Sequence, residues 1–206
     1  MKSTFTHIYQ NNAWNGTESI SGTGSTLEQT KHIVHGIQGL VEKHGIKSIL
    51  DIPCGDFNWM RHVGLGDTIY IGADIVPDII SSNKEEHKSI TFKVLDISED
   101  LLPDVDLIII RDCLVHFSFA DIIKTVKNLK RCNYQYVLTT NFTQRSLNTD
   151  ITTGGWRTLN LKSQPFCLPD SLVDLSEHCT ENGGIYRDKC LSLWDKKSFE
   201  HRIEGL

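Results

Sequence analysis

The chain lacks the features that mark several large classes of protein. Its six cysteines, at positions 54, 113, 132, 167, 179 and 190, include no CxxC pair, so neither a zinc ribbon nor a thioredoxin-type motif is expected. The N-terminal sequence MKSTFTHIYQNNAW has no apolar stretch of the signal-peptide kind. No apolar run approaches the ~20 residues that cross a bilayer. We therefore predict a cytoplasmic protein with no membrane span.

An excess of positive charge is also missing. Lys and Arg number 21 against 26 Asp and Glu, a net charge of −5. Proteins that hold nucleic acid through its phosphates usually carry surplus Lys and Arg. The densest basic segment, 124–131, falls on an expected helix, where a solvated face explains it. Nucleic acid is therefore not expected as a partner, and the sequence leaves a homodimer open.

Alternating strand and helix patterns are present instead. Buried-strand patterns occupy 48–52, 69–73, 90–95, 106–110 and 136–140, and two more follow at 172–177 and 190–194. Apolar residues recur with helical period between them. The alternation predicts right-handed βαβ units and a mostly parallel sheet in an α/β protein.

Helix boundaries have their own signals. Ser25 and Glu28 have the spacing of a capping box, as have Ser118 and Asp121. Gly45 suits a left-handed helix end. Pro77 fits the first turn of a further helix.

We expect one domain over residues 1–206, with two irregular segments. Residues 1–25 are polar with scattered aromatics and are interpreted as an N-terminal cap segment. Residues 143–170 are too long for a plain connection, which favours a functional insertion for substrate.

Carboxylates follow three of the expected strands. Asp51, Asp74 and Asp96 stand at strand ends, where open parallel sheets bind ligands. An acid about 20 residues past the first loop is placed to bind a ribose diol, and Asp96 can accept from an adenine amino group. Helix N-capping is the alternative for each acid alone. Together they predict one crevice for an adenosyl group.

Four segments resemble class I S-adenosylmethionine (SAM)-dependent methyltransferases: 50–56, 70–75, 94–97 and 106–116. The resemblance implies a doubly wound, Rossmann-like α/β fold with an antiparallel C-terminal strand, and SAM as cofactor. It places the Gly55 loop at the methionine part, Asp74 at the ribose and Arg111 beside the sulfonium. The cofactor-binding residues that it implies are Asp51, Pro53, Cys54, Gly55, Asp56, Asp74, Ile75, Asp96, Ile97 and Arg111.

The first loop departs from the usual pattern. Pro53 and Phe57 replace two small residues, which removes the GxGxxG pattern and argues against a nicotinamide oxidoreductase. Ser21 and Gly22 lead into a helix N-terminus, which favours an anion such as the SAM carboxylate or a substrate phosphate. Trp59 can cover the cofactor, although a large aromatic is more often core.

Asp112 and His116 are the predicted catalytic residues. They follow the strand at 106–110, and a histidine near its ordinary pKa of about 6.5 is a suitable general base. In the alternative, His116 packs under the next helix and hydrogen-bonds a carbonyl, and Asp112 only orients ligand groups.

The predicted substrate-binding residues are Asn141, Asp150, Trp156 and Arg157. Arg157 can pair with phosphate or carboxylate. The alternative is a structural Ω-type loop packed by Trp156. No metal-ligand spacing is found, although Asp112, Asn148 and Asp150 can in principle supply oxygen ligands to Mg²⁺.

Residues 14–16 and 18–25, the loop 54–56 and the segment 150–157 resemble small bacterial methyltransferases, some of which are linked to surface-polysaccharide modification, and the resemblance covers nearly the whole chain. This resemblance implies O-methylation of a small-molecule or glycan-precursor hydroxyl, or of a phosphoramidate. A catalytically silent SAM-fold binding protein remains the alternative. Nucleic-acid methylation is disfavoured by the negative net charge.

Overall fold

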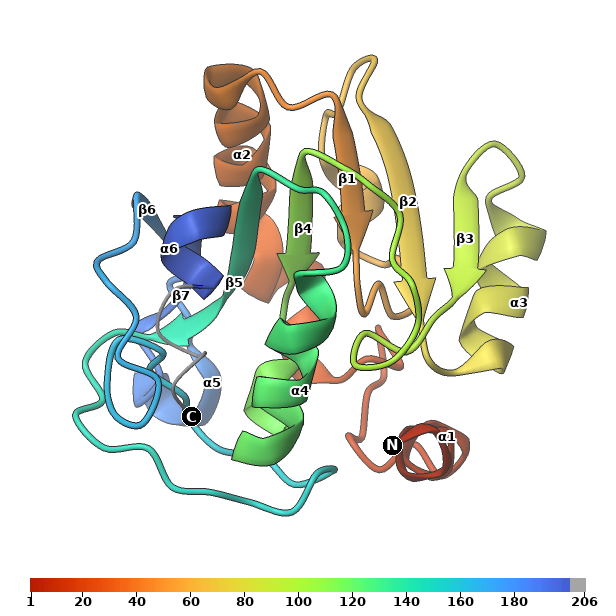
Figure 1. Ribbon diagram of the computed structural model, residues 1–206. Helices are drawn as coiled ribbons and strands as arrows, with labels where there is room; N and C mark the ends of the chain where they lie inside the picture. The colour runs from red at the N-terminus through yellow and green to blue at the C-terminus, as the bar shows by residue number, and fades with distance from the viewer. Residues whose placement is uncertain (201–206) are drawn as a thin grey trace.

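A single seven-stranded sheet forms the centre of the computed structural model, which describes residues 1–200 (Figure 1). The strand order is β3-β2-β1-β4-β5-β7-β6. The strands are β1 (Ser48–Asp51), β2 (Ile69–Asp74), β3 (Thr91–Val94), β4 (Leu107–Ile110), β5 (Tyr136–Phe142), β6 (Val173–Ser176) and β7 (Lys189–Asp195). The last six residues of the predicted domain, 201–206, lie outside the described residues.

Strand direction follows the prediction. β3, β2, β1, β4 and β5 run parallel to one another, and β7 is antiparallel to both of its neighbours, β5 and β6. The predicted Rossmann-like, mostly parallel sheet with an antiparallel C-terminal strand is confirmed.

Helices cover both faces of the sheet, α2 (Leu27–His44) on one and α4 (Phe119–Leu129) on the other (Figure 1). Alternate residues of β4 separate the two cores, as the period of a strand requires. Leu107 and Ile109 pack with the α2 side, while Ile108 and Ile110 pack with the α4 side. All four residues of β4 are buried, which explains the continuous apolar run in this central strand.

Two smaller helices and three short 3₁₀ turns also lie around the sheet. The helices are α3 (Pro77–Glu86) beside β3 and α6 (Lys196–Glu200) after β7. The turns are η1 (Thr23–Ser25), η2 (Met60–His62) and η3 (Leu114–His116), and a kinked segment, α5 (Glu181–Gly184), precedes β7. No helix within residues 1–200 has the length and apolarity needed to span a membrane.

The helix caps confirm three predictions and correct one. Gly45 ends α2 with φ 63°, Pro77 begins α3, and Ser118 Oγ accepts from the Asp121 amide at 3.2 Å. The cap of α2, however, is Thr26, whose side chain accepts from the Gln29 amide. Ser25 instead ends η1, so the chain reaches the extended backbone of a cap one residue later.

The helix α1 (Lys2–Gln10) was not expected within the polar segment 1–25. It buries none of its residues, and its apolar residues Phe5, Ile8 and Tyr9 are only partly buried. It lies off the carboxyl ends of the parallel strands (Figure 1). Phe5 attaches it to Phe117, with ring centroids 5.9 Å apart.

Residues 143–170 contain no regular helix or strand. They pack against η3, where the amides of Gly154 and Arg157 donate to the carbonyls of His116 and Val115. Leu159, Leu161 and Phe166 are fully buried. The segment therefore forms a packed wall beside the strand ends.

Candidate active site

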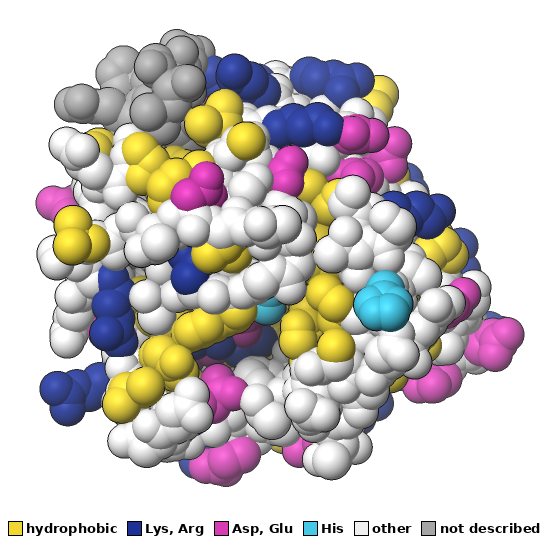
Figure 2. All heavy atoms as spheres, turned by 90° about the horizontal axis from the view of Figure 1, so that it is seen from below, with side chains coloured by type: hydrophobic (Ala, Val, Ile, Leu, Met, Phe, Trp, Pro, Cys, Tyr) yellow, Lys and Arg dark blue, Asp and Glu magenta, His cyan; other side chains and the backbone are white. Residues whose placement is uncertain are grey.

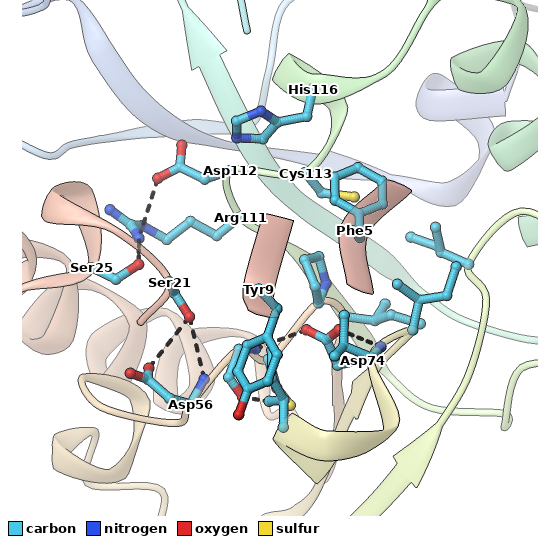
Figure 3. A pocket seen from close by; sticks show the side chains of 18 of the residues that line it. Phe5, Tyr9, Ser21, Ser25, Asp56, Asp74, Arg111, Asp112, Cys113 and His116 are labelled. Carbon is cyan, nitrogen blue, oxygen red and sulfur yellow. Dashed lines mark hydrogen bonds and ion pairs between the residues drawn. The ribbon is translucent and has the colours of Figure 1, made fainter. Parts of the chain in front are cut away.

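A cavity opens at the carboxyl ends of the parallel strands (Figure 3). We call it the strand-end cavity. Its floor is the loop after β1, its sides are the ends of β2 and β4, and α1 covers it with Phe5 and Tyr9.

The loop after β1 is locked to the N-terminal segment. Gly55 has φ 53°, and a Cβ at this position would lie 2.1 Å from Ser21 Oγ. The Asp56 carboxylate accepts from Ser19 Oγ at 2.9 Å and from the Ile20 amide at 2.8 Å. Pro53, Cys54, Gly55 and Asp56 all line the cavity, so the predicted loop lies at the predicted place.

Asp74 lies in the cavity wall at the end of β2. Its carboxylate accepts from the Gly55 amide at 3.2 Å and the Val76 amide at 2.9 Å. Burial raises the pKa of Asp74 to about 6, although these amide bonds oppose the shift. The carboxylate is therefore ionised at neutral pH and is fixed where a ligand can donate to it.

Asp96 also lines the cavity, beside an apolar wall. Its Oδ1 accepts from the amide and hydroxyl of Ser98 at 2.8 and 2.7 Å. Ile75, Leu95 and Ile97 lie next to it in the lining. Apolar side chains bordered by two carboxylates suit a flat ring with polar edges.

Asp51 does not line this cavity, and the prediction that three acids converge is wrong for it. Side chains alternate along β1, so Asp51 lies on the same face as Ile49, in the α2-side core. Tyr70 donates to its carboxyl group at 2.7 Å. Burial raises the pKa of Asp51 to about 7, so its role is structural.

Four charged side chains, of which Asp112 is partly exposed and the other three are buried, form a cluster at the end of β4. Arg111 contacts Glu177 at 2.7 Å and Asp112 at 3.3 Å. Lys189 contacts Asp112 at 2.7 Å and Glu177 at 3.3 Å. Arg111 also donates to the Gly24 carbonyl and lies 5.3 Å from the ring centre of Trp59. The cluster therefore ties the predicted cofactor residues Arg111 and Trp59, both in the cavity lining, to β6 and β7.

Asp112 differs from its predicted catalytic role. Burial opposes its ionisation, but Lys189 and Arg111 outweigh that effect and hold the pKa of its carboxyl group well below the ordinary range. A carboxylate so stabilised is a poor proton acceptor at neutral pH. Its ion pairs therefore favour the alternative role, in which Asp112 orients groups.

His116 makes the carbonyl hydrogen bond of the alternative prediction and also lines the strand-end cavity. Its Nδ1 lies 2.7 Å from the Gly155 carbonyl, and a carbonyl only accepts, so we assign the proton to Nδ1 and the lone pair to Nε2. Burial lowers the pKa of His116, although the Gly155 bond opposes the shift. The ring of Trp14 lies 5.0 Å away, centre to centre. A neutral, oriented imidazole results.

A second cavity, the outer cavity, adjoins the first. Its lining includes Gly22, Gly24, Phe142, Trp156, Glu181, Tyr186 and Lys189. Four residues line both cavities: Trp14, Ser21, Asp112 and His116. Figure 2 views the face below the strand ends, which is hollowed between hydrophobic side chains with charged side chains inside. Gly22 lines this outer cavity and not the strand-end cavity, whereas Ser21 lines both.

Three of the four predicted substrate residues have structural roles instead. The Arg157 guanidinium donates to the carbonyls of Leu114, Phe117 and Thr149 at 2.8–3.1 Å. The Asn141 side chain accepts from the Leu161 amide, and Asp150 accepts from the Phe119 amide at the start of α4. Only Trp156 lines the outer cavity. Anchoring a long irregular segment occupies the Arg157 guanidinium and the Oδ1 atoms of Asn141 and Asp150, because the backbone of the segment has no sheet or helix partners.

The Mg²⁺ alternative loses its support for a related reason. Asp150 is bonded at the start of α4, and Asn148 is bonded to Asn160. Within residues 1–200 no group of three or more His, Cys, Asp or Glu side chains is placed to hold a metal ion.

Glu177 and Lys189 are the site residues that sequence reasoning missed. Neither residue lies in a recognisable sequence motif. They join the cluster around Arg111 and Asp112 because β7 pairs with both β5 and β6. A Lys at the start of an apolar strand, β7, was the available signal, since a Lys that is buried there needs a carboxylate partner.

Comparison with known proteins supports the fold. No family model and no curated protein sequence matches the chain. A SAM-dependent methyltransferase from Leishmania major aligns with 92% of this chain and 83% of its own, at 15% identity and a TM-score of 0.66. Magnesium protoporphyrin IX methyltransferase from Synechocystis, solved with bound SAM, covers 72% and 79%, at 15% identity and 0.53.

Phosphoethanolamine N-methyltransferase 1 from Haemonchus contortus, in complex with phosphoethanolamine and S-adenosylhomocysteine (SAH), is a third similar structure. It aligns with 94% of this chain at 12% identity and a TM-score of 0.60, and this chain spans 48% of its length. These likenesses establish a class I methyltransferase fold for the chain.

Proposed function

We propose that this protein is a SAM-dependent methyltransferase whose strand-end cavity binds SAM and whose outer cavity binds the acceptor. The observation that carries the proposal is the junction of the two cavities at Trp14, Ser21, Asp112 and His116. A methyl donor and a nucleophile must meet in line at short range. Two cavities with a shared boundary provide for that meeting.

The residues of the strand-end cavity fit SAM part by part. Asp74 accepts from the ribose hydroxyls, and Asp96 and Ile97 border the adenine. The Gly55 loop lies along the methionine part, and Arg111 and Asp112 lie beside the sulfonium. Solved structures of the same fold contain SAM or SAH, which supports this choice of cofactor over a nicotinamide.

His116 is the residue that we assign as general base. SAM supplies a methyl group already activated on a cationic sulfur. The chain must hold the acceptor and take the proton of its hydroxyl, and the lone pair on Nε2 can do so because Nδ1 is engaged by Gly155. Asp112 stabilises the imidazolium that forms, since its carboxylate lies nearby and stays ionised.

The proposed acceptor is a hydroxyl on a small molecule or glycan precursor. A glycan precursor of the surface-polysaccharide kind rests on the sequence resemblance alone. A phosphoramidate has less support, because the predicted phosphate contact, Arg157, is bonded to three carbonyls.

Calorimetric titration with SAM, SAH and NADH tests the proposal. We expect SAM and SAH to bind at micromolar concentration and NADH not to bind. SAH production should then depend on an acceptor from a panel of hydroxyl compounds, and His116→Ala should abolish it while retaining SAM binding. Absence of SAM binding would refute the proposal. Tight binding without turnover on any acceptor would favour a silent binding protein.

A further inference from the structure

Three aromatic rings form one side of the outer cavity. Trp156 and Tyr186 have ring centres 5.1 Å apart, and Phe142 lies 6.1 Å from the first and 6.0 Å from the second. Trp156 belongs to the segment 143–170 and Tyr186 to the turn before β7, so the fold brings together two rings that are far apart in the sequence. Trp156 is 45% exposed, which leaves ring surface available to a ligand.

The cations near the outer cavity are already paired. Lys189 lines it, but its ammonium group contacts both Asp112 and Glu177. Arg111, which does not line the outer cavity, contacts the same two carboxylates. An anionic ligand would therefore have to compete with carboxylates that are held at 2.7–3.3 Å.

Glu181 adds a further negative charge to this cavity. Its Oε1 accepts from Thr23 Oγ1 at 2.6 Å, and it forms no ion pair within residues 1–200. A Cβ placed on Gly24 would lie 3.5 Å from both Glu181 Oε2 and Asp112 Oδ2, and 3.6 Å from Lys189 Nζ. Glu181 therefore stands next to the cluster and adds a third carboxylate to its two cations.

One uncompensated negative charge beside aromatic rings favours a cation. An ammonium group gains from the ring faces and from the field of the carboxylates, while phosphate or carboxylate is repelled. We propose that the acceptor carries a protonated amino group, which Glu181 and the rings of Trp156 and Tyr186 hold in the outer cavity. This inference rests on the proposed function and defines the chemical class of its acceptor.

The amino group serves as the anchor of the acceptor. The anchoring side chains lie on the α5 and long-segment side of the outer cavity, whereas His116 lies on the boundary with the strand-end cavity. An acceptor held by its ammonium group at one side can therefore present a hydroxyl to His116 at the other.

Choline and its uncharged isostere 3,3-dimethylbutan-1-ol are the probes that test this inference. Trp14 and Trp156 both line the cavity, so quenching of tryptophan fluorescence in SAH-loaded protein reports binding. We expect choline to bind about tenfold more tightly than the isostere. Glu181→Gln should remove most of that difference, and the exposed-site control Glu85→Gln should keep it.

A second variant separates the rings from the charge. Trp156→Leu keeps an apolar side chain but removes the ring, so choline should weaken while 3,3-dimethylbutan-1-ol changes little; Trp14 continues to report. Equal binding of the two probes by the unmodified protein, or preferential binding of inorganic phosphate, would overturn the inference. Failure of SAH to bind would instead refute the proposed function, and the probe comparison can then be made on the unliganded protein.

Discussion

At the scale of single residues, side-chain orientation separates two acids that look alike in the sequence. Asp51 and Asp74 both end parallel strands. Asp51 lies in the α2-side core and receives a hydrogen bond from Tyr70, whereas Asp74 lies in the cavity wall between two amides. Their burial raises both pKa values, to about 7 and about 6, but the consequences differ.

For Asp74 the consequence is in ligand binding. Asp74→Asn should weaken SAH binding about 10- to 100-fold at neutral pH, because hydrogen bonds to a charged group contribute about 1.5–3 kcal/mol. In the unmodified protein, affinity should fall as the pH drops below about 6 and the carboxylate is protonated. Calorimetry over a pH series measures both effects.

The neighbouring exposed acid provides the control. Asp78→Asn removes a carboxylate from the first turn of α3, outside the cavity lining, and should leave SAH affinity unchanged. If Asp74→Asn binds SAH as well as Asp78→Asn does, Asp74 is not the ribose ligand.

For Asp51 the consequence is in stability. Its raised pKa means that the folded state keeps a proton that the unfolded state loses between about pH 4 and pH 7. Stability contributed by this group therefore falls as the pH rises through that window. Urea unfolding should show Asp51→Asn gaining stability relative to the unmodified protein as the pH rises from about 4 to about 7. A difference independent of pH would contradict the assignment.

His116 gives a third prediction at this scale. Because burial lowers its pKa, the imidazole should remain neutral at pH values where a histidine of ordinary pKa, about 6.5, is half protonated. An NMR titration of the ring signals, assigned with His116→Gln, measures this directly. A midpoint at or above the ordinary value would remove the case for His116 as a neutral base.

At the scale of elements, α1 acts as a cover over the strand-end cavity. Tyr9 lines the cavity and His7, on the same helix, does not. Covering ~60 Å² of apolar ligand surface contributes about 1.5 kcal/mol, so Tyr9→Ala should weaken SAH binding about tenfold. His7→Ala should have no effect on affinity. Equal affinities for the two variants would show that α1 does not cover the cofactor.

The segment 143–170 is held to η3 mainly through Arg157. Arg157→Ala leaves three carbonyls without their donor, which should cost about 3 kcal/mol and lower Tm by about 6–12 °C. The exposed Arg187→Ala is the matched control. An unchanged Tm for Arg157→Ala, together with a loss of turnover, would restore Arg157 as a substrate ligand.

At the scale of the whole molecule, local patterns predicted more of the sheet than of the site. The spacing of apolar residues and the helix caps are local signals, so the strands, α2 and α4 could be predicted from the sequence. The rule that ligands bind at the carboxyl ends of parallel strands placed Asp74 and Asp96 in the strand-end cavity. Glu177 and Lys189 could not be placed, because the pairing of β7 with β5 and β6 brings them to Asp112. Arg157 was misassigned because the same guanidinium can pair with a phosphate or with carbonyls of its own chain.

The junction of the two cavities is the central claim, and a crystal structure with bound SAH tests it most directly. We predict the ribose hydroxyls on Asp74, the adenine between Asp96 and Ile97, and the sulfur at the boundary formed by Trp14, Ser21, Asp112 and His116. Electron density that placed the sulfur away from this boundary, or SAH outside the strand-end cavity, would contradict the account.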